Sequence, residues 1–411
     1  MSLENRLARF VDSIRANAAL PLRLELWNGH HYDLAGRTTV TITVPKPNAL
    51  RYLISPDLNK LGEAFVEGHI KVEGSVDEIF RVANGLARAA SAGTRAGFHF
   101  LRRHSRRRDR EAIQYHYDVD NDFYRLFLDE GMLYSCAYFR EESDTLEQAQ
   151  IQKLDHILGK LMLQPGDRLL DIGCGWGSLI LRAAQHYGAR ATGITLSQNQ
   201  YELARERIRA AGMQDRCRVE LCDYRDLDAR GGFDRIASVG MFEHVGLKNL
   251  PVYFGKINDL LADDGLVLNH GITASDPDSR WVGLGAGDFI DRYVFPDGEL
   301  PHVSLVLSEM ARAGFEVTDA ESLRRHYART CSEWSHRLEA ARERAALLAG
   351  DKRYRIWQIY LAGCAYGFAN GWMNIYQLLA CKASNAQARP LPLTRDYMYR
   401  NGPAQAAPDS R

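Results

Sequence analysis

Residues 168–178 combine an acid with three spaced glycines, a pattern that suits a cofactor site. Asp171 is followed by Gly173, Gly175 and Gly177 in the run D-I-G-C-G-W-G. Glycines at such positions let a turn close and bring backbone N–H groups near a ligand at a helix start. The spacing is G-x-G-x-G, unlike the G-x-G-x-x-G of dinucleotide binders. Between a strand and a helix, this motif favours S-adenosylmethionine (SAM) over a nicotinamide dinucleotide.

Residues at the ends of the next two expected strands are candidates for the same cofactor site. A dinucleotide fold places an acid at the end of its second strand to hold the ribose, but Thr195 and Leu196 stand there. Asp223 and Tyr224 follow the third strand, where an acid can accept from an adenine amino group. An ordinary strand-end turn is the alternative interpretation of Asp223.

These motifs lie in an alternating series of strand and helix signals that begins near residue 145. We expect strands at 168–172, 191–196, 219–222, 233–239 and 265–270, and helices at 178–187 and 197–211. The alternation predicts an α/β fold with a doubly wound, mostly parallel sheet, the Rossmann-like class of SAM-dependent methyltransferases. The N-terminal part has a β-branched run at 38–44 and helical signals over 58–86, which predict a smaller α+β domain.

Composition changes along the chain predict four segments. They are an accessory, lipid-associated domain (1–100), a basic linker (101–112), a catalytic domain (113–400) and a disordered tail (401–411). The linker has no apolar periodicity. Its arginines form either a solvated hinge or a patch for anionic lipid headgroups.

The bulk composition excludes several classes of protein. The 411 residues hold 52 basic and 52 acidic side chains, so we expect no nucleic-acid partner. The seven cysteines form no C-x-x-C pair or zinc pattern, and the start lacks a signal-peptide core, so we expect a cytoplasmic protein. Residues 356–381 carry no charge but four amides, which favours a buried helix over a membrane span. Gly363, Gly367 and Gly371 are expected on one face of that helix, open to another backbone.

Several motifs together resemble those of cyclopropane fatty acid synthases, over nearly the whole chain. They are residues 134–139, 170–177, 195–197 with Gln200, 239–246 and 293–301. Residues 61–68 resemble the accessory domain of the members that act on phospholipids. The resemblance implies transfer of the SAM methyl group, as a methylene bridge, to the cis double bond of unsaturated phospholipid acyl chains. The carbocation formed on the way is deprotonated by a bound bicarbonate ion.

The same resemblance implies a set of site residues. The bicarbonate ligands are Cys136 and Ile272, through their backbone, and the side chains of Glu243, His270 and Tyr327. Cys364 is a secondary candidate, and its apolar surroundings favour a packing role. The SAM contacts are the glycine motif with Tyr134, Ser135, Asp171, Thr195, Leu196, Gln200, Asp223 and Tyr224. A homodimer that docks transiently on the inner face of the membrane is implied as well.

Three other functions stay open at this point. A related lipid C-methyltransferase forms a methyl or methylene branch, or acts on a diene, and differs only in which proton the carbocation loses. A small-molecule N-methyltransferase needs no bicarbonate, so dependence on that ion separates it. A non-catalytic lipid-binding module keeps the SAM pocket without turnover.

Overall fold

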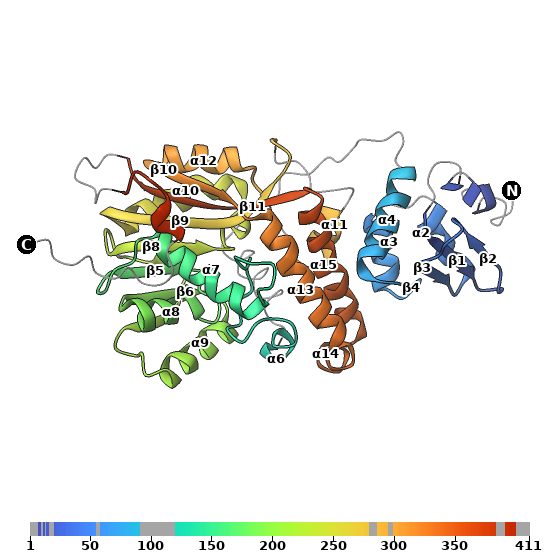
Figure 1. Cartoon of the computed structure of the whole chain (residues 1–411), viewed down its shortest axis with the longest axis horizontal. Coiled ribbons are helices and arrows are strands. Elements are labelled where there is room, and N and C mark those ends of the chain that lie inside the picture. Colours follow the sequence, from blue (N-terminus) through green and yellow to red (C-terminus); the bar gives the residue numbers. More distant parts are fainter. Residues whose placement is uncertain are drawn as a thin grey trace, which may run out of the picture.

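The computed structural model describes residues 7–9, 11–12, 14–15, 20–54, 58–90, 120–278, 286–294, 299–383 and 391–399. Within them the chain forms two separate sheets, a small one near the N-terminus and a large one after residue 167 (Figure 1). The expected linker 101–112 and tail 401–411 lie outside the described residues.

The large sheet has seven strands in the order β10-β11-β9-β8-β5-β6-β7. Its strands are β5 (Arg168–Ile172), β6 (Arg190–Thr195), β7 (Cys217–Leu221), β8 (Phe233–Val239), β9 (Leu261–Ala274), β10 (Phe315–Ser322) and β11 (Met373–Lys382). Neighbours from β9 to β7 pair in parallel, whereas β11 pairs antiparallel with both β9 and β10. The predicted α/β class with a mostly parallel sheet is therefore confirmed.

Helices cover both faces of this sheet, as a doubly wound fold requires. One core cluster joins the strands to α7 (Leu146–Lys160), α8 (Ser178–Tyr187) and α9 (Gln198–Ala210). The other joins them to α10 (Leu250–Leu260) and α12 (Val303–Arg312). Thr145 caps α7 in a reciprocal capping box with Gln148, which fixes where that helix begins.

A third, aromatic core lies at one end of the large sheet. It joins α6 (Asn121–Tyr124) and the chain that follows it to α13 (Arg324–Ala340), α14 (Arg342–Ala349) and α15 (Asp351–Ala369). Short 3-10 turns complete the large unit, namely η2 (Tyr224–Asp226), η3 (Phe242–His244), η4 (Leu247–Asn249) and η5 (Asp396–Tyr399). Because α13 follows β10 directly, this helical layer lies beside the carboxyl ends of the parallel strands.

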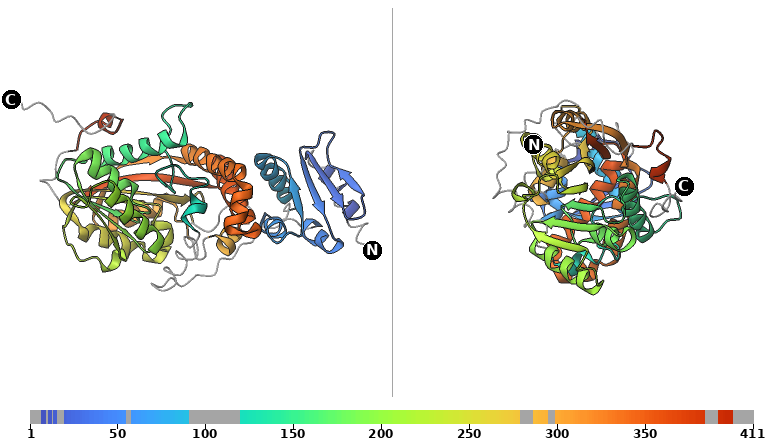
Figure 2. Two further views of the ribbon diagram at one scale, coloured as in Figure 1. Left: turned by 90° about the horizontal axis from the view of Figure 1, so that it is seen from below. Right: turned by 90° about the vertical axis from the view of Figure 1, so that its left-hand side faces the viewer.

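The N-terminal unit combines a mixed four-stranded sheet with helices, as the sequence predicts. Its strands are β1 (Leu22–Leu26), β2 (His31–Asp33), β3 (Val40–Val44) and β4 (Lys71–Glu73), and its helices are η1 (Pro47–Leu50), α2 (Arg51–Ile54), α3 (Leu58–Val66) and α4 (Val76–Ala90). It packs against α15 and α11 (Ala286–Tyr293) at one end of the molecule (Figures 1 and 2). Glu67 forms an ion pair with Lys352 at 2.9 Å, and Arg355 donates a hydrogen bond to the Val66 carbonyl at 2.8 Å.

The prediction of one helix over residues 356–381 is wrong. Helix α15 ends at Ala369, and Gly371 turns the chain at a φ of 72° into strand β11. Because β11 pairs on both sides and is covered on both faces, its sequence is as uncharged as a buried helix. Gly363 faces the Phe80 ring rather than a backbone. Within the described ranges, no helix is long and apolar enough to cross a membrane.

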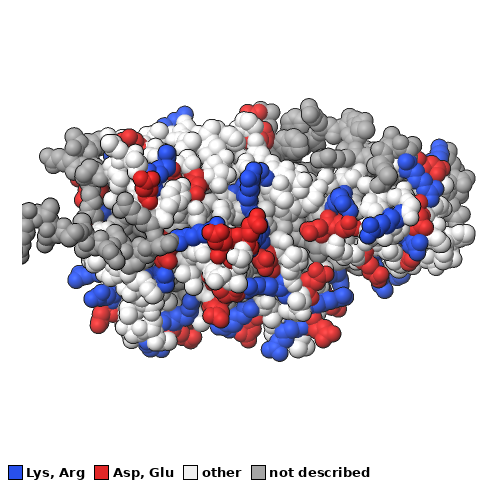
Figure 3. Space-filling model, viewed as in Figure 1, with Lys and Arg blue, Asp and Glu red and all other residues white. Residues whose placement is uncertain are grey.

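Charged side chains of both signs are interspersed on the face shown in Figure 3. Pairs such as Arg168–Asp234 at 2.8 Å and Arg337–Glu147 at 2.7 Å tie neighbouring elements together. This mixture agrees with the equal numbers of acidic and basic residues in the chain.

Candidate active site

A cleft opens beside the glycine turn, at the carboxyl ends of β5, β6 and β8. It holds about 1190 Å³ of empty space when its open mouth is included. Ten of the residues expected to contact SAM line it: Tyr134, Ser135, Asp171, Gly173, Gly175, Thr195, Leu196, Gln200, Asp223 and Tyr224. Gly177 is not among the lining residues, because it is the N-cap residue of α8, at a φ of 85°.

The glycine turn owes its shape to left-handed backbone angles. Gly173 and Gly175 have φ values of 81° and 53°, which other residues adopt only with strain. The turn is tied to the next strand, because the N–H groups of Gly173 and Cys174 both donate to the Ile194 carbonyl, at 3.0 and 2.9 Å. The floor of the cleft is therefore rigid backbone.

Two buried charged groups meet in this cleft. Burial raises the pKa of Asp171 to about 7, although the charge of Lys153 opposes the shift. Burial likewise lowers the pKa of Lys153 to about 8, against the charges of Asp129 and Asp171. The Lys153 ammonium donates to the Ser135 hydroxyl at 2.8 Å. Among the described residues, Oδ1 of Asp171 has no hydrogen-bond partner, so it is free to accept from a ligand.

The other polar lining groups are already bonded to one another. Arg225 makes two bonds to the Asp223 carboxylate, at 2.9 and 2.7 Å, so an adenine amino group has to share that carboxylate. The Thr195 hydroxyl donates to Oε1 of Gln200 at 2.7 Å. These bonds fix the side chains before any ligand binds.

The expected catalytic residues lie behind the wall of the cleft. Glu243 belongs to η3, and the N-cap residue Met241 and the last residue His244 of this turn line the cleft. Its Oε1 accepts from the Ile272 N–H at 2.6 Å, and burial raises its pKa to about 7 despite that bond. His270 precedes Ile272 by two positions on β9, so both side chains point to the same face.

Two atoms of this group are buried without a partner within the described part of the chain. They are Oε2 of Glu243 and Nε2 of His270. Burial lowers the pKa of His270 to about 3, and the charges of Lys153 and Lys160 add to the shift. The ring is therefore neutral at physiological pH and carries one N–H. An acceptor and a donor thus stand ready for a small polar ligand.

Cys136, Tyr327 and Cys364 belong to the aromatic core, against which Ile272 and Tyr134 also pack. Burial raises the pKa of the Tyr327 phenol well above its usual range, so it stays a donor. Burial also raises the pKa of the Cys364 thiol to about 12, which keeps it out of the reactive thiolate form. The structure thus supports the packing role for Cys364.

The sequence did not single out three residues that the structure brings into the site. Lys153 and Trp176 line the cleft, and Gln377 contacts His270 from β11. A lysine between buried positions of a helix was an available signal for Lys153. For Gln377 the signal was an amide in an otherwise apolar run.

Comparison with known proteins places these features in a family context. The profile described as mycolic acid cyclopropane synthetase matches residues 104–378, and that of a domain of unknown function matches residues 10–92. A probable fatty acid methyltransferase of Pseudomonas putida is 51% identical over 381 residues, 93% of this chain and 97% of that protein.

Two solved structures resemble this fold. One is a mycolic acid cyclopropane synthase in complex with SAH and CTAB, which gives a TM-score of 0.63 at 38% identity and covers 66% of this chain and 98% of that one. The other is coclaurine N-methyltransferase bound to N-methylheliamine and SAH. It gives a TM-score of 0.60 at 26% identity and covers 79% of this chain and 99% of that one.

Proposed function

Since the chain belongs to the mycolic acid cyclopropane synthetase family, we propose that it adds a methylene bridge from SAM to the cis double bond of unsaturated phospholipid acyl chains. Membership confirms the family resemblance seen in the sequence and makes the chain a SAM-dependent methyltransferase. The proposal goes further in naming the product and the substrate.

The cleft suits a cationic methyl donor. The unpartnered Oδ1 of Asp171 lies at its floor, and a positive ligand lowers the pKa of that carboxyl and keeps it ionised. Lys153 offers an ammonium to a ligand carboxylate from the same cleft. SAM carries an ammonium, a sulfonium and a carboxylate, which matches this arrangement of charges.

The two unpartnered atoms behind the cleft suit a bicarbonate ion, and they are the observation that carries the proposal. Among the described residues, Oε2 of Glu243 and Nε2 of His270 have no partner, so an acceptor and a ring nitrogen together fit an anion that bears its own hydroxyl. The Tyr327 phenol and the backbone at Cys136 and Ile272 complete the expected ligand set, although the Ile272 N–H is already donated to Glu243. A bicarbonate ion bound there would supply a small base beside the SAM cleft.

The reaction needs alignment, removal of one proton and exclusion of water. Methyl transfer breaks the methyl–sulfur bond, forms a carbon–carbon bond to one alkene carbon and leaves a carbocation on the other. Loss of a proton from the new methyl group then provides the electron pair that closes the ring. Tyr134, which lines the cleft and packs on Trp334 at 5.2 Å, offers an aromatic face to the cation. The aromatic core behind it excludes water, which would trap the cation.

The N-terminal unit favours a phospholipid substrate. A cyclopropane mycolic acid synthase of Mycobacterium tuberculosis matches 66% of this chain with 96% of its own length, so it has no counterpart to this unit. The fatty acid methyltransferase of Pseudomonas putida covers 93% of this chain. We also propose a cytoplasmic homodimer that docks transiently on the membrane, for which mass measurement and vesicle flotation are the tests.

A branched acyl chain is a second possible product and must be tested beside the cyclopropane. Because the 51% identical relative is named only a fatty acid methyltransferase, a methyl or methylene branch is the second candidate. It requires the same SAM cleft and the same carbocation, and differs only in the proton that is lost.

The test is turnover of defined lipid vesicles. Purified protein with SAM and vesicles of an oleoyl phospholipid should give acyl chains one CH₂ heavier, while saturated vesicles stay unchanged. NMR of the product separates a cyclopropane from a branch. Removal of bicarbonate should abolish turnover, and adding bicarbonate back should restore it. This dependence separates lipid cyclopropanation from N-methylation, which needs no bicarbonate. Equal inertness of unsaturated and saturated lipids contradicts the proposal.

A further inference from the structure

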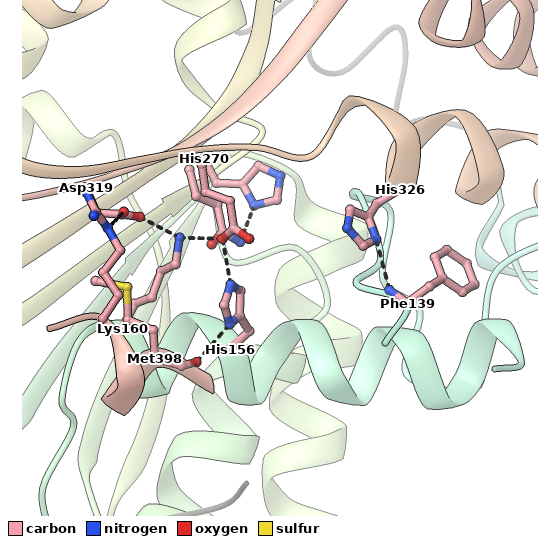
Figure 4. Close-up of polar contacts among 10 residues, drawn as sticks. Phe139, His156, Lys160, His270, Asp319, His326 and Met398 are labelled. Atoms are coloured by element: carbon pink, nitrogen blue, oxygen red, sulfur yellow. Dashed lines mark hydrogen bonds and ion pairs between the residues drawn. The ribbon is translucent and has the colours of Figure 1, made fainter. Parts of the chain in front are cut away.

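A row of polar side chains crosses the large sheet beneath α7. Gln377 on β11 pairs with His270 on β9 at one side and with Glu321 on β10 at the other. Residues directly opposite in antiparallel strands point to the same face of a sheet. The three side chains therefore form one line, and helix α7 covers it through His156 and Lys160 (Figure 4).

The outer end of the row is filled with ion pairs. Oε2 of Glu321 lies 2.7 Å from Nε2 of His156 and 2.6 Å from the Lys160 ammonium. Lys160 also reaches Asp319 at 3.0 Å, and Arg395 donates to the same carboxylate at 2.6 Å. Burial raises the pKa of Glu321, but the bond from His156 and the charge of Lys160 hold it down at about 2. The outer end is thus ionised and fixed.

The inner end leaves two buried polar atoms without a partner among the described residues, Nε2 of His270 and Oε1 of Gln377. The Gln377 amide nitrogen lies 3.2 Å from Nδ1 of His270, and both side chains are buried. With the Gln377 amide placed so, its nitrogen donates to Nδ1, and this assigns the ring proton to Nε2. In the part of the chain that the structure describes, that Nε2 has no partner. A buried donor is unfavourable when it has no acceptor, so this geometry is suited to an acceptor atom of a ligand.

We propose that Gln377 is a positioning residue that holds His270 neutral with its proton on Nε2, aimed at the small anion of the active site. This inference rests on the proposed function, in which that anion acts as a base. A charged imidazolium would give its proton to a basic anion and remove the base, whereas a neutral N–H binds the anion and leaves it basic. The positive charges of Lys153 and Lys160 also oppose a second proton on the ring, while the charge of Glu321 acts in the opposite direction.

The inference is tested by the protonation of His270, read by ¹⁵N NMR of protein labelled at histidine. The chain has 13 histidines, so the His270 signals are assigned by their loss in a His270→Asn variant. The wild-type spectrum should show the proton on Nε2 and none on Nδ1. A proton on Nδ1, or a mixture of the two forms, overturns the proposal, whether or not the Gln377 variants fold.

Two variants and a control then separate positioning from packing. Gln377→Met removes the donor at similar volume, and should mix the tautomers and lower turnover about 10- to 100-fold, the usual cost of losing such a partner. Gln377→Glu, once ionised, can only accept, and should move the proton to Nδ1. Tyr376→Phe changes the next residue of β11, on the opposite face, and should alter neither tautomer nor turnover.

The outcomes also distinguish this inference from the proposed function. Lost turnover in Gln377→Met with an unchanged tautomer makes Gln377 merely structural and overturns the inference. A wild-type protein that leaves unsaturated phospholipid unmodified, but carries the His270 proton on Nε2, refutes the proposed function alone. SAM affinity should be equal in all these proteins, because neither Gln377 nor Tyr376 lines the cleft.

Discussion

Replacing Glu243 with glutamine should make the protein more stable at high pH while it abolishes turnover. The glutamine can keep the bond that Oε1 accepts from the Ile272 N–H at 2.6 Å. It removes a carboxyl group whose pKa burial raises from 4.5 to about 7. A side chain retained at a cost in stability is typical of a functional site.

The size of the effect follows from linkage. A carboxyl with a raised pKa contributes stability that is fully present below its unfolded pKa and is lost as pH rises through the folded value. A tenfold change in an acid dissociation constant corresponds to about 1.4 kcal/mol. Between about pH 5 and about pH 8 the wild type should therefore lose about 2–3 kcal/mol of unfolding free energy relative to Glu243→Gln.

The assay is urea unfolding of both proteins across that pH range, in buffer without SAM and depleted of carbonate. Asp171 also titrates near pH 7, but it is present in both proteins, so its contribution cancels in the difference. Turnover of the variant should fall about 100-fold or more, as for a lost acid–base group. A difference in stability that does not change with pH would refute the argument, since it would mean that Glu243 is not buried as a carboxylate.

Three further substitutions test the cleft and the aromatic core. Lys153→Met removes the ammonium bonded to Ser135 and should weaken SAM binding about tenfold by calorimetry, the worth of one charge-assisted hydrogen bond. Gly193→Ala places a Cβ 2.7 Å from Sγ of Cys174 in the glycine turn. It should lower the unfolding free energy by about 1–3 kcal/mol and weaken SAM binding. Thermal melting with and without SAM measures both effects. Cys364→Ala should keep most of the turnover, because the buried thiol serves only in packing. Urea titration should show a loss of about 1 kcal/mol in unfolding free energy. A large loss of turnover would instead indicate a chemical role for Cys364.

The sequence predicted the centre of the fold well where local signals agree. Strand β5 and helix α8 occupy the expected residues 168–172 and 178–187, because an apolar run, three glycines and an amphipathic segment follow in order. Strand β8 matches its expected bounds for the same reason. Most of the residues expected to contact SAM line one cleft because they follow strand ends that share one edge of the sheet, and their contact with SAM stays a prediction.

Other features depend on contacts between distant segments. Asn370-Gly371 is a local stop signal between α15 and β11. The residues after it do not show a strand by their pattern, because a strand buried on both faces has no alternation of apolar and polar residues. The bond between Gln377 and His270 joins residues 107 positions apart, and only the register of β11 against β9 creates it. A single sequence does not fix that register.

The unpartnered polar atoms argue that this part of the molecule is built for two ligands rather than one. Asp171, Glu243 and His270 lie on or just after the neighbouring strands β5, β8 and β9, and each buries one atom without a partner among the described residues. At about 1–3 kcal/mol each, they cost a large part of the roughly 5–15 kcal/mol that holds a typical protein folded. Asp171 offers an acceptor to a cation, whereas Glu243 and His270 pair an acceptor with a donor, which suits a protonated anion. A cationic methyl donor beside a small basic anion satisfies all three, and their opposite charges should make each bind more tightly in the presence of the other.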